Sequence, residues 1–425
     1  MESSRLCPIT CTLFACLLGA LSVPPARAQE DLWVPDVPMT RTTGTNARAT
    51  GMGGAYLAIS DDAGALRFNP AGLARVRRIE FSGGINDRRL EIETTDSGTR
   101  AQTEQTRTRV SSLGFVYPFP TYRGSMVIGF GYSVPYALDR EYIRRGARGQ
   151  ATLEEAIYQE GSIGEWSFGY AVDVSPTMSL GFRATWLHGS FFQDWAFSNA
   201  IYEGSGAIHD VVDTDVNGYT ASLGAMTRLG GWGRMGLVLD LPKWMTLSSS
   251  VSEDGGVTST TYESDMTIPF SAAAGVAAWF QRLLLTADLR MTDWSQIDYA
   301  GPLRYWDDTG RHLAHRRTWD LHAGAEYLLD LGHTTGLRLR AGVAREPVPY
   351  GVVLEDIENG YVPDYAKADF DPDYLYFTAG AGILIEESLT VDAAYTTGSF
   401  TRQGGRLVEE EDERRLLLTA GFRLQ

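Results

Sequence analysis

The chain lacks cysteine outside its first 28 residues, because Cys7, Cys11 and Cys16 all lie before Gln29. Residues 1–28 carry an early arginine, an apolar run and an Ala-Arg-Ala motif, which together predict a cleaved secretory signal peptide. A lipoprotein signal at Cys16 is a weaker alternative, since the apolar run continues past it. The mature chain can therefore form no disulfide and no thiol site, although an exported protein meets an oxidising compartment.

Positive charge and long apolar runs are also scarce. The chain has 37 Lys and Arg against 53 Asp and Glu, a formal net charge of −16. An acidic surface of this kind argues against nucleic acid as a partner. Beyond the signal peptide there is no run of about eighteen apolar residues, so no transmembrane helix is predicted. A soluble exported protein and an outer-membrane β-barrel remain.

What the chain does contain is a series of segments in which apolar and polar residues alternate. Leu283, Leu285 and Leu289 fall on one face of such a segment, and Asp288 and Arg290 fall on the other. This period of two predicts strands with one apolar face. About fourteen such segments follow one another, an even number that suits a bacterial barrel. They lie near residues 79–93, 108–118, 125–138, 162–174, 178–193, 214–229, 234–249, 262–280, 283–299, 317–329, 336–346, 374–385, 388–398 and 413–424.

The connections between these segments alternate in length. Long polar segments such as residues 140–160 and 351–372 follow the odd-numbered strands, and tight turns such as residues 175–177 follow the even-numbered ones. This alternation is typical of the extracellular loops and periplasmic turns of a barrel. A soluble sandwich or propeller does not require it. The predicted fold is an all-β transmembrane antiparallel barrel over residues 78–425.

Aromatic residues near the predicted strand ends favour the girdles that barrels place at the membrane interfaces. Ordinary core or turn packing is the alternative for each of them. The residues expected in the girdles are Tyr117, Phe119, Trp166, Trp232, Trp279, Trp294 and Tyr327.

Residues 29–77, before the first predicted strand, are rich in glycine and alanine. Their glycine spacing resembles a dinucleotide-binding loop, but no βαβ unit surrounds it, so no nucleotide cofactor is predicted. A wide barrel encloses a lumen that is plugged or left open, and small residues let a segment pack closely against strand backbones. We therefore predict a plug whose Asn69 amide satisfies buried backbone groups. The motif residues are Gly51, Gly53, Gly54, Asn69, Pro70 and Ala71.

These motifs resemble the long-chain fatty acid transporter family (FadL/TodX) of outer-membrane proteins. The glycine run, the Asp61-Asp62 pair and the Asn-Pro-Ala motif carry the resemblance, together with residues 292–299 and 339–350. The resemblance implies a fourteen-stranded barrel with an N-terminal hatch in the outer membrane of a Gram-negative-type bacterium. It further implies a monomer that contacts outer-membrane lipid and lipopolysaccharide and takes up a hydrophobic small molecule by diffusion, without a cofactor. The ligand, long-chain fatty acid or hydrocarbon-like, stays open.

The resemblance also implies that the ligand exits sideways through an inward kink of the third strand, residues 124–138 here. Pro135 lacks the N–H needed for a ladder hydrogen bond, and Gly129 and Gly131 are expected to weaken the neighbouring pairing. These three residues are the predicted position of a lateral opening. The alternative is a proline at the frayed end of an ordinary strand.

Two other functions stay open. One is a barrel that binds a protein partner or takes part in secretion. The other is a lipid-modifying barrel enzyme, because His188 and Ser190 lie on one face of the fifth predicted strand, as in outer-membrane lipid deacylases. A catalytic triad needs a third, orienting group, and none is evident in the sequence. We therefore predict no catalytic residues and no enzyme activity.

No metal site is predicted either. His312 and His315 lack a third ligand for zinc. Asp369, Asp371 and Asp373 lack the glycine and closing glutamate of a calcium loop. Both groups are interpreted as solvated loop charge.

Overall fold

A computed structural model of the chain describes residues 44–148, 151–199, 208–253, 258–300, 311–332, 335–354, 369–370, 373–404 and 407–424. The predicted signal peptide and residues 29–43 lie outside this part of the chain. Within it, no helix combines the length and the hydropathy that a membrane span requires.

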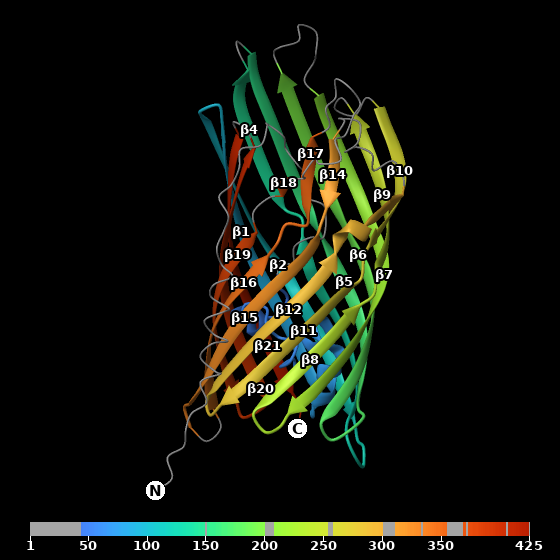
Figure 1. Cartoon of the computed structure of the whole chain (residues 1–425), viewed down its shortest axis with the longest axis vertical. Helices are drawn as coiled ribbons and strands as arrows, with labels where there is room; N and C mark the ends of the chain where they lie inside the picture. Colours follow the sequence, from blue (N-terminus) through green and yellow to red (C-terminus); the bar gives the residue numbers. More distant parts are fainter. Residues whose placement is uncertain are drawn as a thin grey trace.

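The strands form one closed antiparallel barrel (Figure 1). Closure is seen at β1 (Glu80–Asp96), which pairs with β2 (Thr99–Phe119) on one side and with β21 (Leu407–Arg423) on the other. The sheet has 18 segments but fourteen barrel strands, because four barrel strands are each interrupted once. The fold predicted from the alternating pattern is therefore confirmed.

Four barrel strands are interrupted once each: β3 (Met126–Ala137) is followed by β4 (Arg140–Arg148), β8 (Gly233–Asp240) by β9 (Lys243–Glu253), β10 (Thr258–Ile268) by β11 (Ser271–Phe280), and β12 (Leu283–Asp293) by β13 (Asp298–Ala300). A separate three-stranded sheet lies toward the upper end in Figure 1 and consists of β14 (Arg311–His315), β17 (Tyr350–Leu354) and β18 (Asp369–Phe370). The remaining barrel segments are β5 (Ala151–Asp173), β6 (Met178–Asn199), β7 (Ile208–Leu229), β15 (Arg317–Asp330), β16 (Thr335–Glu346), β19 (Tyr374–Ile385) and β20 (Leu389–Gly404).

Several segments expected as long loops are strands instead. β1 and β2 are joined by Ser97 and Gly98 alone, both with positive φ angles of 51° and 85°. The polar residues above the membrane pair across strands, as the 2.6 Å ion pair between Arg89 and Glu104 illustrates. Backbone pairing needs no apolar face where both sides of a sheet meet water, so the polar composition concealed these strand ends.

A continuous aromatic row crosses the outer face of five neighbouring strands. Tyr132, Trp166, Trp186, Tyr219 and Trp244 are direct cross-strand partners in β3, β5, β6, β7 and β9. Below this row, toward the short turns, the outward side chains are large and apolar. Such an arrangement marks a membrane interface. The apolar residues include Phe168, Phe182, Leu223, Leu237 and Leu239.

Two tryptophans expected in the girdles lie in the lumen instead. Trp294 is only 7% exposed and belongs to a single 3-10 turn, η3 (Trp294–Gln296), that ends β12. The Asp293 carboxylate accepts hydrogen bonds from the side chains of Ser295 (2.6 Å) and Gln296 (3.3 Å), and these bonds hold the turn. Trp279 packs against the plug. The expectation for Trp294 and Trp279 was therefore wrong.

Three short helices lie inside the lower half of the barrel, where they are blue in Figure 1. They are α2 (Ala47–Gly51), α3 (Ala65–Phe68) and η2 (Pro70–Arg75). We call the described residues 44–77 the hatch. Close approach to the wall is visible at Gly53, where an added Cβ atom would lie 2.7 Å from the backbone nitrogen of Val343. The predicted packing of small residues against strand backbones is confirmed.

Candidate functional site: hatch, luminal cavity and the β2–β3 seam

Asn69 connects the hatch to the barrel wall. Its side-chain nitrogen donates hydrogen bonds to the carbonyl oxygens of Leu57 (2.9 Å) and Ala225 (3.2 Å), and its side-chain oxygen accepts one from the Ala71 backbone (3.1 Å). The residue is fully buried and caps η2, in which Pro70 occupies a position that needs no N–H donor. The predicted bonding of the Asn69 amide is confirmed.

The three motif glycines lie where the hatch meets strands β15, β16 and β19. Gly53 and Gly54 have positive φ angles of 66° and 81°. The Gly53 carbonyl oxygen lies 2.7 Å from Nδ1 of His322, and the Gly53 N–H donates to the Thr378 hydroxyl over 3.0 Å. A Cβ atom on Gly51 would lie 3.2 Å from the Gly380 backbone. These glycines therefore shape a contact between backbones.

Buried charges hold the hatch on two sides. The Arg48 guanidinium pairs with Asp61 over 2.6 Å and with Glu326 of the wall over 3.2 Å. On the opposite side, Arg183 of the wall donates to the carbonyl oxygens of Leu66 (2.9 Å) and Arg67 (3.0 Å). Removing one partner of a buried ion pair typically costs about 3–5 kcal/mol. Displacing the whole hatch would thus break several such contacts at once.

The two neighbouring hatch carboxyl groups differ in their electrostatic environment. Burial alone raises the pKa of both Asp61 and Asp62. For Asp61 the charge and hydrogen bond of Arg48, together with the charges of Arg234 and Arg423, outweigh burial and lower the pKa, whereas the pKa of Asp62 stays raised. Asp62 accepts a hydrogen bond from the Tyr56 hydroxyl over 2.7 Å. The Asp61-Asp62 pair is therefore bonded within the hatch.

A cavity of about 200 Å³ lies between the hatch and the upper part of the barrel. Its lining combines charged side chains near the hatch with apolar side chains from the wall. The charged group includes Arg67, Arg183, Asp240, Lys243, Asp288 and Arg290. The apolar group includes Tyr136, Ile268, Trp294, Val348, Tyr374 and Tyr376.

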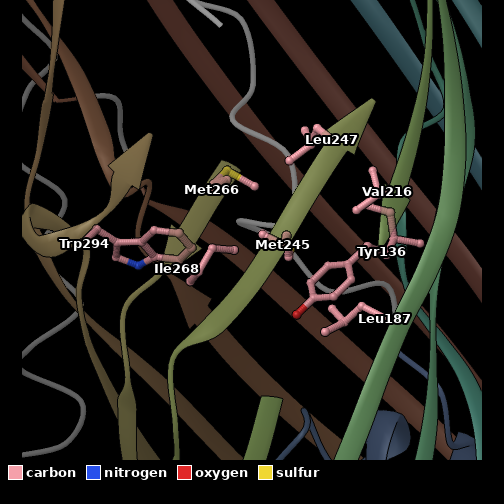
Figure 2. Packing of buried hydrophobic residues seen from close by; sticks show 9 residues of the cluster. Tyr136, Leu187, Val216, Met245, Leu247, Met266, Ile268 and Trp294 are labelled. Carbon is pink, nitrogen blue, oxygen red and sulfur yellow. The ribbon is translucent and has the colours of Figure 1, made fainter. Parts of the chain in front are cut away.

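An apolar cluster on the luminal side of the wall adjoins this cavity, and Figure 2 shows its side chains reaching inward from neighbouring strands. Barrel interiors are ordinarily polar and water-filled, so a buried apolar cluster on the inner face indicates an affinity for apolar matter. Alternation alone does not identify such a luminal cluster, because it does not tell which face points inward: in β9, Met245 and Leu247 point inward, whereas Trp244 and Ser248 point outward. The cluster consists of Tyr136, Ile163, Leu187, Val216, Met245, Leu247, Met266, Ile268 and Trp294.

The pairing between β2 and β3 ends part of the way up the barrel. Its last paired residues are Ser112 and Ser133. Above them, β3 stays paired with β5 but shifts register between Ser133 and Tyr136, the stretch that contains Pro135. Among the described strands, none pairs with Thr99–Ser111 on the side away from β1. We call this interrupted boundary the seam.

Gly129 and Gly131 do not interrupt the ladder, in contrast to the expectation that they weaken the neighbouring strand pairing. Both are paired with β2 and with β5. A Cβ atom on Gly129 would lie 3.2 Å from Leu66 and 3.3 Å from Leu73, and one on Gly131 would lie 2.9 Å from Leu66. Their missing side chains make room for the hatch, and the irregular pairing is confined to the neighbourhood of Pro135.

A small pocket of about 30 Å³ lies at the seam, below the last paired residues. Hatch residues Ala63, Leu66 and Arg67 line it from inside. Leu113, which is 52% exposed on the outer face, and Tyr132 of the aromatic row also line it. The pocket is therefore lined by hatch residues and by residues of the seam together.

His188 and Ser190 lie on the outer face of β6, just above the aromatic row. Nδ1 of His188 is 3.0 Å from the side-chain oxygen of Asn217, and its ring stacks on Trp186. In the described part of the chain, no hydrogen bond joins His188 to Ser190 and no carboxylate orients the ring. The arrangement lacks the nucleophile–base contact that a hydrolase requires.

Together, a closed antiparallel barrel, an apolar outer band below an aromatic row and a plug in the lumen define a hatch-bearing outer-membrane channel. The chain belongs to the outer-membrane transport protein family OMPP1/FadL/TodX, whose profile matches residues 37–422. No protein with a curated functional description matches it by sequence.

Solved structures share the fold at low sequence identity. A Pseudomonas aeruginosa FadL homologue is 16% identical, with 91% of this chain and 100% of that chain covered and a TM-score of 0.66. The P. putida toluene transporter TodX is 15% identical, with 91% and 99% covered and a TM-score of 0.60. The Ralstonia pickettii toluene transporter TbuX is 14% identical, with 90% and 99% covered and a TM-score of 0.58.

Proposed function

We propose that the protein takes up hydrophobic small molecules across the outer membrane by diffusion, without a cofactor. The observation that carries this proposal is the apolar cluster on the luminal wall beside the cavity (Figure 2). A channel for polar solutes has no use for such a surface, and a barrel serving only as a docking platform for proteins needs no cavity. The structural relatives named as toluene transporters support the same class of ligand.

The proposed path begins at the end of the barrel that carries β4 and passes along the apolar cluster to the cavity. There the hatch blocks the direct route, because its removal would break the Arg48–Glu326 pair and the Arg183 contacts. Exit through the seam avoids that cost, since the β2–β3 pairing already ends at Ser112 and Ser133. We therefore propose a lateral exit near Pro135 into the membrane.

The proposal includes the arrangement of the chain in the cell. The signal peptide, residues 1–28, is removed on export, residues 29–77 act as the hatch, and the barrel works as a monomer among outer-membrane lipid and lipopolysaccharide. The end that carries β4 faces outward. A long-chain fatty acid and an aromatic hydrocarbon are the two ligand types to distinguish.

Uptake by cells that display the barrel tests the proposal. Cells of a Gram-negative host without its own hydrocarbon channels would be given labelled oleate or toluene, with a labelled trisaccharide as the polar control. The double variant Met245→Gln/Leu247→Gln makes the luminal cluster polar, and Ser248→Gln makes a matched change on the exposed outer face of the same strand. We expect faster entry of at least one hydrophobic probe, reduced in the double variant alone. A folded wild-type barrel that admits neither probe would show that the proposed function is wrong.

A further inference from the structure

The luminal cavity and the seam pocket share two lining residues, Thr45 and Arg67. Both belong to the hatch. Thr45 is short and buried, whereas Arg67 has a long side chain that extends from α3. A single hatch arginine thus stands between the space that holds a ligand in the proposed function and the pocket at its proposed exit.

Among the hatch arginines whose side chains are largely buried, Arg67 is the loosely bonded one. Arg48 pairs with Asp61 over 2.6 Å, and Arg75 pairs with Asp173 over 3.0 Å. The Nε atom of Arg67 lies 3.7 Å from Oε2 of Glu165, which is too long for a hydrogen bond. Within the described residues, the Arg67 guanidinium makes no other ion pair and no side-chain hydrogen bond.

Glu165 is equally under-bonded. Its side chain is 2% exposed, and its Oε2 atom has no hydrogen-bond partner. A buried carboxylate oxygen without a donor is costly, so the contact with Arg67 is one that a better partner can replace. Glu165 pairs across the strands with Ser133, where the β2–β3 ladder ends. The loose ion pair therefore lies directly behind the seam.

We propose that Arg67 and Glu165 form a gate that opens the seam pocket to ligands with an anionic end and holds it closed to neutral hydrocarbons. This inference rests on the proposed uptake function and names the ligand class that the exit selects. It applies to an amphipathic anion whose hydrocarbon part lies on the apolar cluster.

The selectivity follows from the bonds available to Arg67. A ligand carboxylate in the cavity offers Arg67 short, charge-assisted hydrogen bonds that Glu165 does not provide at 3.7 Å. Lys243 lines the same cavity and adds attraction for an anion. When Arg67 turns toward the ligand, the side chain that separates the two spaces moves aside. A neutral hydrocarbon offers no such bond and leaves Arg67 in place.

Glu165 keeps a cationic neighbour when Arg67 turns away. Arg183 interacts electrostatically with Glu165, and its own Nε atom is buried without a hydrogen-bond partner. The carboxylate is therefore not left as an isolated buried charge, which would prevent the movement. The Glu165 carboxylate can therefore exchange Arg67 for Arg183 as its cationic neighbour.

Transport of matched probes tests the gate in the complete barrel reconstituted in vesicles. Oleate and methyl oleate share a hydrocarbon chain and differ in charge, so the ratio of their delivery rates into the membrane isolates the role of the anion. The variants are Arg67→Gln and Glu165→Gln, with Arg67→Lys as the charge-conserving change. Arg77→Gln is the matched control, because Arg77 is an exposed hatch arginine that lines neither cavity.

We expect Arg67→Gln to lower the oleate rate about tenfold, because one charge-assisted contact is lost. The same variant raises the methyl oleate rate, because the shorter neutral side chain no longer separates the two spaces. Arg67→Lys retains most of the oleate rate. Glu165→Gln removes the one ion pair that Arg67 makes within the described residues and raises the methyl oleate rate. The ratio of oleate to methyl oleate delivery then falls because methyl oleate is delivered faster. Arg77→Gln matches the wild type.

Two outcomes separate the gate from the uptake function. If Arg67→Gln and Glu165→Gln both leave the ratio at its wild-type value while both probes are delivered, the gate is wrong and uptake stands. If the wild type delivers neither probe, the uptake proposal itself fails. Should Arg67→Gln not yield a folded, heat-modifiable barrel, the rise in methyl oleate delivery by Glu165→Gln decides the question.

Discussion

The side-chain nitrogen of Asn69 lies 3.2 Å from the carbonyl oxygen of Ala225, although 156 positions separate the two residues in the chain. The contact fits because Gly224 next to it has no side chain, and a Cβ atom there would lie 2.3 Å from the Asn69 side-chain oxygen. The side chain of a hatch residue is thereby hydrogen-bonded directly to the backbone of the barrel wall. Hatch and barrel are one folded unit at this point.

Replacing Asn69 with alanine should loosen the hatch without unfolding the barrel. The change removes three hydrogen bonds and leaves the buried carbonyl group of Leu57 and the partly buried one of Ala225 without this donor. Each unsatisfied group costs about 1–3 kcal/mol. We expect a folded, heat-modifiable barrel with a lower midpoint of thermal unfolding and an altered rate of hydrophobic uptake. Uptake and midpoint equal to those of the wild type would reduce Asn69 to a replaceable residue.

Gly53→Ala should be far more harmful than Gly98→Ala. Both glycines have positive φ angles, 66° and 85°, so both variants carry a similar backbone cost of about 1–2 kcal/mol. A Cβ atom at position 53 also meets the Val343 backbone at 2.7 Å, whereas one at position 98 meets nothing within 4 Å. The measurement is ion leak through single barrels in a planar bilayer. Equal ion leak in the two variants would contradict close packing of Gly53 against the Val343 backbone.

Locking the seam should slow ligand release. Ser112 and Ser133 are the last paired residues of β2 and β3, and the mature chain has no competing cysteine. A Ser112→Cys/Ser133→Cys barrel, joined by a disulfide or a short cross-linker, should bind ligand but deliver it slowly until the link is cleaved. Thr214→Cys/Ser249→Cys joins β7 and β9, lines neither the cavity nor the seam pocket, and serves as the control. Delivery at full rate through a locked seam would place the exit elsewhere.

Single cysteines should reveal the orientation of the barrel. Gly98 lies in the turn at the end that carries β4, whereas Gly231 and Gly332 lie in turns at the opposite end, and each has open space around it. A membrane-impermeant maleimide applied to intact cells should label Gly98→Cys and leave the other two unlabelled. The reverse pattern would invert the proposed orientation and move the entrance to the periplasmic side.

Much of this architecture could be predicted from the chain, because a period of two and a short hatch motif depend on local sequence. Strand alternation shows that two faces differ, but it does not tell which face meets lipid when both are apolar. In β9, Trp244 points outward and Met245 inward. Trp294 was misplaced because hydrogen bonds to Asp293 turn the chain there.

The contacts at the seam were beyond prediction for a different reason. Gly131 lies in a regular ladder, and its role depends on Leu66, which is 65 positions earlier in the chain and reaches it only in the folded lumen. Arg67 likewise gains its position from two cavities that hatch and wall form together. Properties of this kind come from packing between distant segments, which a single sequence does not display.

The strands continue far beyond the aromatic row. At about 3.3 Å per residue and a tilt of about 40°, the part of β6 from Trp186 to Asn199 rises about 30 Å above that row. In the proposed orientation, this height carries the rim through the hydrated sugar coat that lipopolysaccharide forms around the cell. Hydrophobic molecules diffuse slowly through such a hydrated coat. The tall wall would place the outer opening of the barrel beyond this coat, so that a hydrophobic ligand enters without crossing it. The same exposed rim would be the part of the protein that antibodies and bacteriophages can reach.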